Sequence, residues 1–94
     1  MFEAPAAKAN VQITFKLYAS LSECLPVAHR VGNQMPLTVA AGATILQTIE
    51  PFGLPMKLVH LVLVNGVYIP PEQRATRTFV DGDVLAIWPP IAGG

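Results

Sequence analysis

The chain has 94 residues, of which 52% are hydrophobic, so it can bury the core of one domain but is too short for two. Six Lys and Arg balance six Asp and Glu, and the formal net charge is zero. This balance argues against a nucleic-acid partner, because such binding rests on many cations that neutralise phosphates. The longest apolar stretch, residues 58–64, is interrupted by His60. It is far shorter than the roughly 20 residues of a spanning helix, so no membrane segment is expected.

The two ends of the sequence differ in pattern. Residues 1–10 contain four alanines and a proline without periodicity, which predicts a flexible leader before a single domain at residues 11–94. The leader lacks the basic region and apolar core of a secretory signal. Cys24 is the only cysteine, so no internal disulfide can form. These features favour a reduced, cytoplasmic protein.

Two strands are predicted in the first half of the domain. Residues 11–18 alternate apolar and polar side chains, the two-residue period of a strand with one buried face. Residues 34–40 alternate in the same way, and Pro36 favours an edge position because proline cannot donate to a ladder. Between them, Leu21 and Leu25 are spaced for a helical turn that the following proline interrupts.

The clearest helix signal begins at Thr44. Its hydroxyl can accept a hydrogen bond from the first turn, and Gln47, three residues later, completes a capping box. Pro51 fits poorly inside a helix and Gly53 is a good stop signal. The sequence therefore predicts one short helix.

The second half of the domain predicts three more strands. Residues 58–64 are apolar and β-branched, as expected for a central strand buried on much of both faces, and residues 67–69 follow as a short partner across an Asn65-Gly66 type I′ turn. An Asp-Gly-Asp turn at residues 81–83 leads into the last strand at residues 84–88. One helix on a small mixed sheet defines an α+β two-layer domain.

The last strand predicts an apolar patch beside the C-terminus. Val84, Ala86 and Trp88 alternate with Leu85 and Ile87. One set must pack on the helix, which leaves the other to extend a patch on the opposite face. Trp88 fits equally a partner contact or an aromatic at the rim of the core.

Residues 89–94 predict an extended tail whose terminal carboxylate can take part in a reaction. Pro89 and Pro90 stop strand pairing and restrict the backbone just before the terminus. Gly93 and Gly94 have no Cβ, so they can enter a narrow channel and bring the terminal carboxylate close to another protein. Two terminal glycines by themselves are a weak signal, because glycine is a common residue.

Other polar residues predict no catalytic or metal site. His60 has no second ligand at metal-binding spacing, so a packed or edge histidine is expected and no metal. Arg74 and Arg77 are expected on a solvated face, or docked to an acidic partner. Asp81 and Asp83 are better explained by turn chemistry than as a catalytic pair. No glycine-rich phosphate loop is present, so the chain should not bind ATP itself.

Residues 63–66 and 81–94 together resemble the MoaD/ThiS sulfur-carrier family. The aromatic-Pro-Pro-aliphatic-X-Gly-Gly ending is similar to the small subunit of molybdopterin synthase, and residues 91–94 are equally similar to the thiazole-forming carrier. The likeness covers residues 11–94 in element order. It implies a ubiquitin-like β-grasp fold. The leader and the lack of a long helix at residues 25–33 depart from the family pattern.

The resemblance also implies a defined chemistry at Gly94. An E1-like adenylating enzyme would activate its carboxylate, and a persulfide sulfur donor would displace AMP to leave a thiocarboxylate. A synthase large subunit would then accept the tail and pass the sulfur on, most simply in molybdopterin (molybdenum or tungsten cofactor) biosynthesis. The chain would be a carried co-substrate that binds no cofactor, and not an enzyme.

The partner contacts that the resemblance implies lie on and after the last strand. They comprise Trp88, Pro89, Pro90, Ile91 and Ala92, with Gly93 next to the reacting Gly94. Three alternatives stay open: a thiazole-type (thiamine) or other metabolite carrier, a ubiquitin-like protein modifier, and a plain interaction module whose glycines have no chemical role.

Overall fold

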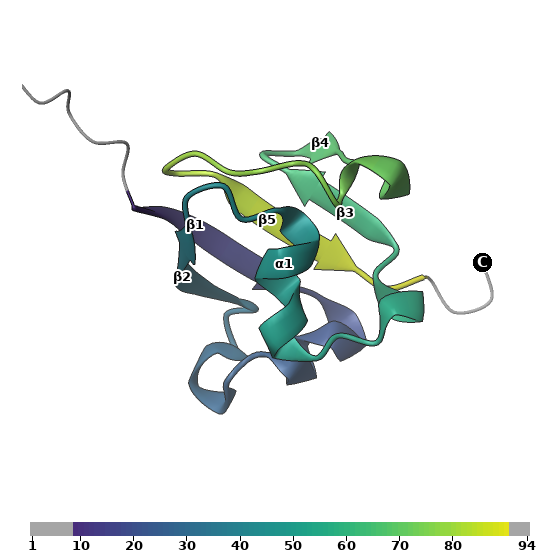
Figure 1. The fold of residues 1–94 in the computed structure, drawn as a ribbon. Helices are drawn as coiled ribbons and strands as arrows, with labels where there is room; N and C mark the ends of the chain where they lie inside the picture. The colour runs from purple at the N-terminus through teal and green to yellow at the C-terminus, as the bar shows by residue number, and fades with distance from the viewer. Residues whose placement is uncertain (1–8, 91–94) are drawn as a thin grey trace, which may run out of the picture.

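A computed structural model describes residues 9–90 and has one five-stranded sheet with a helix packed on one face (Figure 1). The strands and the helix are β1 (Asn10–Leu17), β2 (Gln34–Ala40), α1 (Ile45–Ile49), β3 (Leu61–Val64), β4 (Val67–Tyr68) and β5 (Val84–Trp88). Short 3₁₀ turns occur at Ala19–Cys24, Val27–His29, Glu50–Phe52, Met56–Leu58 and Pro71–Gln73. The predicted α+β class is confirmed.

The strand order β2-β1-β5-β3-β4 puts the last strand in the middle of the sheet. β5 runs parallel to β1 and antiparallel to β3, while β2 and β4 form the two edges through antiparallel pairs. In Figure 1, β5 passes behind α1 with β1 on one side and β3 on the other. The chain therefore leaves its final strand from the centre of the domain.

The core lies between the sheet and α1. On β1, Phe15 and Leu17 are fully buried, and on β5 the same is true of Leu85 and Ile87. Phe15 also packs on Phe52, with ring centroids 4.7 Å apart. Leu85 and Ile87 are therefore the residues of the last strand that face α1, while Ala86, on the other face, is also buried at 7% exposure.

The predicted capping box at the start of α1 is confirmed. The Gln47 backbone N–H donates to the Thr44 hydroxyl at 3.2 Å, and the Thr44 N–H donates to the Gln47 side-chain oxygen at 3.0 Å. These bonds satisfy donors that the first helical turn leaves without partners. The helix then tightens into a 3₁₀ turn that ends at Gly53, where φ is 68°. The capping box at its start and the turn at Gly53 therefore account for the short length of the helix.

The predicted hairpin turn is also confirmed. Asn65 and Gly66 both have positive φ, 52° and 81°, as a type I′ turn requires. The Asn65 side chain donates to the Asp83 carboxylate at 2.8 Å and accepts from the Val84 N–H at 2.8 Å. Asp83 is 5% exposed and also accepts from the Val80 N–H. Turn chemistry therefore explains this aspartate.

The prediction for the third strand was wrong in two respects. β3 has four residues, Leu61–Val64, because the preceding stretch forms the 3₁₀ turn Met56–Leu58. It is also buried on one face rather than both: Val62 is fully buried, whereas Leu61 is 36% exposed. Among residues 9–90 no helix covers the second face, so Leu61 there is partly open to solvent.

The connection from β1 to β2 contains 3₁₀ turns at Ala19–Cys24 and Val27–His29. Leu21 and Leu25 are each 1% exposed and close one end of the core. Among residues 9–90 no helix is long and apolar enough to cross a membrane.

Candidate functional site

The end of β5 is held on both sides up to its last residue. The Tyr18 N–H donates to the Ile87 carbonyl at 3.1 Å, and the His60 N–H donates to the Trp88 carbonyl at 3.2 Å. Pro89 and Pro90 follow at once, and neither has an N–H with which to continue a ladder. The chain therefore stops pairing at a defined point in the middle of the sheet.

The predicted tail residues fall into two groups. Pro89 is half-buried and Pro90 is exposed. The other predicted tail residues are Ile91, Ala92, Gly93 and Gly94, which lie outside the described part of the chain. Their roles as partner contacts and reacting terminus stay predictions.

Trp88 stacks face to face on Tyr18. The ring centroids are 4.2 Å apart and the ring planes differ by 4°. The parallel register that pairs Leu17 with Ile87 brings the next residues of the two strands side by side. Trp88 lies on the face opposite the buried Ile87, so it is not a rim residue of the core under α1. Its half-buried ring remains partly accessible.

The face of the sheet opposite α1 carries a set of apolar side chains, here called the open-face patch. It consists of Tyr18, Leu61, Leu63, Tyr68 and Trp88, together with Ala86, which is 7% exposed. The register pairs Leu61 with Trp88, and Leu63 with both Ala86 and Tyr68. Leu61 and Tyr68 are 36% and 50% exposed. The patch therefore runs from the tail-bearing strand across β3 to β4.

Arg74 was expected on a solvated face, and that prediction was wrong. It is 5% exposed, and its guanidinium donates to the carbonyls of Ile69, Val59 and His60 at 2.9, 3.2 and 3.0 Å. The guanidinium carbon also lies 5.9 Å from the centroid of the Tyr68 ring. Carbonyls at the ends of short strands lack ladder partners, and the planar five-donor group satisfies several at once. Local sequence contains no signal for this role.

The remaining candidate polar residues form no catalytic constellation. His60 is exposed, and the structure over residues 9–90 contains no group of three or more His, Cys, Asp or Glu that could hold a metal ion. Asp81 accepts a hydrogen bond from the Gln12 N–H at 2.8 Å, as expected for a structural turn. Arg77 is half-buried and donates to the Thr78 carbonyl.

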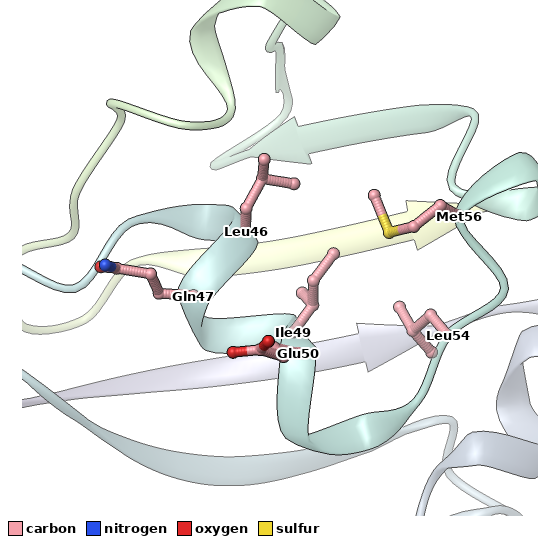
Figure 2. Close-up of a pocket in the computed structure, with 6 residues that line it drawn as sticks. All are labelled: Leu46, Gln47, Ile49, Glu50, Leu54 and Met56. Carbon is pink, nitrogen blue, oxygen red and sulfur yellow. The ribbon is translucent and has the colours of Figure 1, made fainter.

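A hollow of about 430 Å³ lies on the helix side of the molecule, between α1 and the Met56–Leu58 turn (Figure 2). Apolar side chains line most of it: Leu46, Ile49, Leu54 and Met56. Gln47 and Glu50 are the polar members of the lining, and Figure 2 shows them pointing away from the apolar set. Glu50 is the one ionisable residue among those that line this hollow, and it points away from the apolar set, so the lining forms no catalytic pair.

A central last strand that ends in two prolines, beside a one-helix mixed sheet, defines a ubiquitin-like β-grasp protein. Residues 10–92 match the family model described as Mut7-C ubiquitin, and the chain belongs to that family. The match includes every strand of the sheet. The expectation of a ubiquitin-like protein, drawn from the MoaD/ThiS resemblance, is confirmed.

Three solved structures share the fold. The solution structure of the HVO 2177 protein from Haloferax volcanii has a TM-score of 0.69 at 22% identity, covering 98% of this chain and 94% of that one. The crystal structure of SAMP1 from Haloferax volcanii has a TM-score of 0.61 at 22% identity, covering 88% and 99%. The small archaeal modifier protein 1 (SAMP1) from Methanosarcina acetivorans, solved in solution, has a TM-score of 0.60 at 18% identity, covering 90% and 98%.

The search of curated proteins gives no match to this chain.

Proposed function

We propose that this chain is a sulfur carrier whose Gly94 carboxylate is adenylated by an E1-like enzyme and converted to a thiocarboxylate. The observation that supports the proposal most is that the C-terminal tail begins at the end of the central strand, β5. Hydrogen bonds hold β5 up to Trp88, and two prolines then prevent further pairing. The residue from which the tail starts is therefore held at a fixed position in the sheet.

The chemistry proceeds in balanced steps at one carbon atom. A Gly94 carboxylate oxygen attacks the α-phosphorus of ATP, and pyrophosphate leaves. A persulfide sulfur of the donor then attacks the acyl carbon, and AMP leaves with the electron pair of the broken C–O bond. A thiol of the donor or the activating enzyme cleaves the resulting acyl disulfide, which releases the thiocarboxylate and forms a disulfide. Partners supply every reacting group other than the Gly94 carboxylate. The chain therefore acts as a carried reagent, binds no cofactor and is not itself an enzyme.

The open-face patch supports a role in partner binding next to the tail. It presents the Tyr18–Trp88 stack and the partly exposed Leu61 beside the point where the tail begins. Aromatic side chains are enriched at the centres of interfaces. We propose that the E1-like enzyme and a synthase large subunit contact Trp88, Pro89 and Pro90, together with Ile91 and Ala92 of the tail.

Intact mass spectrometry tests the carrier chemistry. The full chain is incubated with an E1-like enzyme from the same source, ATP and a persulfide donor. The expected result is a mass gain equal to the exchange of one oxygen for sulfur, absent when Gly94 is removed. A Val31→Ala chain is the matched control, because Val31 is 97% exposed and lies in the connection between β1 and β2. No mass gain, with an enzyme active on another carrier, would contradict the proposal.

The acceptor we propose is a molybdopterin precursor, in the cytoplasm, and the Pro89-Pro90 pair supports it through its likeness to the synthase small subunit. A thiazole-type or other metabolite acceptor is the alternative within the same chemistry. Incubating the thiocarboxylate form with each purified synthase and measuring its return to carboxylate distinguishes the two.

A second candidate function is a ubiquitin-like modifier joined through Gly94 to lysines of other proteins. Two of the structural neighbours are named as small archaeal modifier proteins, which supports this second candidate function. High-mass conjugates of an epitope-tagged chain, lost when Gly94 is removed, would support this function. Absence of both conjugates and sulfur transfer would leave an interaction module.

A further inference from the structure

The hollow between α1 and the Met56–Leu58 turn, here called the α1 hollow, combines core side chains with an exposed one. Its lining residues are Leu46, Gln47, Ile49, Glu50, Leu54 and Met56. Ile49 and Leu54 are buried, whereas Met56 is 58% exposed. Figure 2 shows Leu46 and Ile49 on the helix side of the hollow, with Leu54 and Met56 on the other side. Methionine adapts its shape to an occupant, so an exposed methionine beside apolar walls favours a binding surface.

Glu50 gives the α1 hollow a charge of one sign. It is the one ionisable residue among those that line the hollow, and Lys57 of the neighbouring turn is not among them. Glu50 lies in the last turn of the helical segment that ends at Gly53. The helix dipole carries partial negative charge at this end, so a carboxylate there is unfavourable unless a cation is close. Within residues 9–90 no cation pairs with Glu50. A positive charge placed beside the hollow is therefore favourable.

We propose that the α1 hollow binds a short segment of another protein in which an aliphatic or aromatic side chain stands next to a lysine or arginine. The apolar side chain enters between Leu46 and Met56, and the cation pairs with the Glu50 carboxylate at the edge of the hollow. The open-face patch lies on the opposite side of the sheet. The site therefore goes beyond the proposed carrier function and does not depend on the chemistry at Gly94.

The charge of Glu50 decides between other possible occupants. An anionic membrane surface and a phosphate backbone have the same sign of charge as the carboxylate and would be repelled. The chain's own C-terminal tail contains no cationic side chain and carries the terminal carboxylate, so it is disfavoured for the same reason. A basic and apolar protein segment satisfies both the walls and the charge of the hollow.

Titration of the isotope-labelled full chain with an acetylated, amidated peptide of sequence GSRLFKSG tests the proposal by NMR. We expect saturable shifts of the Glu50 amide and of the Leu46 and Met56 methyl signals. A peptide of sequence GSELFESG keeps the apolar pair but reverses the charge, and it should bind roughly tenfold more weakly. Absence of saturable shifts, equal affinity of the two peptides, or shifts confined to the open-face patch would overturn the proposal.

Charge reversal in the protein separates binding from folding. Glu50→Lys should weaken binding of GSRLFKSG roughly fivefold and strengthen binding of GSELFESG by a similar factor. The Tm of this variant should stay equal or rise, since a cation is favourable at the end of a helix. Glu72→Lys is the matched control, because Glu72 is exposed and does not line the hollow. The same change of affinity in both variants would contradict a site at Glu50.

A substitution of the apolar wall tests the other half of the proposal. Met56→Gln keeps the length of the side chain but makes it polar, and it should weaken binding of GSRLFKSG roughly fivefold. The Tm should change little, because Met56 is largely exposed. Unchanged affinity of this variant would show that the peptide binds by charge alone and would overturn the role of the hollow.

Two results would assign the α1 hollow to a different occupant and so overturn the proposal. Shifts of the Glu50 and Met56 signals on dilution of the free chain would indicate a second copy. Shifts of the same signals when residues 1–8 are deleted would indicate the chain's own N-terminus.

Discussion

Arg74 connects segments that are distant in sequence through backbone oxygens. Its guanidinium bonds carbonyls on both sides of the β3–β4 hairpin, at Val59 and His60 before it and Ile69 after it. The His60 N–H in turn bonds the Trp88 carbonyl. The position where the tail leaves the sheet is thus tied to this arginine.

Arg74→Lys should lower the free energy of unfolding by about 2–3 kcal/mol. A lysine ammonium cannot reproduce the planar fork, and two of the three hydrogen bonds, to the Ile69 and Val59 carbonyls, are buried. Urea denaturation measures the loss. Arg77→Lys is the matched control and should change stability by under about 0.5 kcal/mol, because the Arg77 side chain donates to the adjacent Thr78 carbonyl and its backbone hydrogen bonds are retained by lysine. Equal effects of the two substitutions would contradict the bonding described for Arg74.

Tyr18→Ala should shift the fluorescence emission of Trp88 to longer wavelength. Trp88 is the only tryptophan, and removing the stacked ring exposes one of its faces to water. Tyr68→Ala is the control, since Tyr68 lies opposite Leu63 rather than Trp88. If both substitutions shift the emission equally, the Tyr18–Trp88 stack is not the cause.

At the scale of the element, α1 is short and depends on its termini. Five residues form the helix, too few for propensity alone to stabilise it. The capping box at one end and burial of Ile45 and Ile49 against the sheet hold it in place.

Thr44→Ala should lower the free energy of unfolding by about 1 kcal/mol, because the N-terminal donor of the helix loses its acceptor. Thermal denaturation followed by circular dichroism measures the change. Thr44→Ser retains the hydroxyl and should stay close to the unsubstituted chain. A serine variant as unstable as the alanine variant would show that the methyl group, not the cap, is responsible.

In the molecule as a whole, the central strand β5 contributes both to the stability of the core and to the surface beside the proposed reactive terminus. Ile87 is fully buried under α1, while its neighbour Trp88 lies in the open-face patch. One strand therefore supplies core on one face and partner surface on the other. The two roles can be separated by substitution, because alternate residues of a strand point to opposite faces.

Ile87→Ala should lower the free energy of unfolding by about 2–5 kcal/mol, since it leaves a cavity in the core. Val84→Ala, on the opposite face of the same strand, removes a partly exposed side chain and should cost under about 1.5 kcal/mol. Guanidinium denaturation of both variants makes the comparison. Similar losses would contradict the assignment of the two faces.

Features that depend on neighbouring residues could be predicted from the amino-acid sequence alone. The alternation of β1 and β2, the capping box at Thr44 and the positive-φ turn at Asn65 follow from local sterics and hydrogen bonding. The Gly-Gly ending and its resemblance to sulfur carriers were likewise read without a structure.

Contacts between residues that are far apart in the sequence could be seen only in the folded chain. The parallel pairing of β1 with β5 produces the Tyr18–Trp88 stack, and the segments on either side of the β3–β4 hairpin supply the carbonyls that accept hydrogen bonds from Arg74. Such contacts depend on strand order and on the single helix covering one face, and neither is encoded in a local pattern.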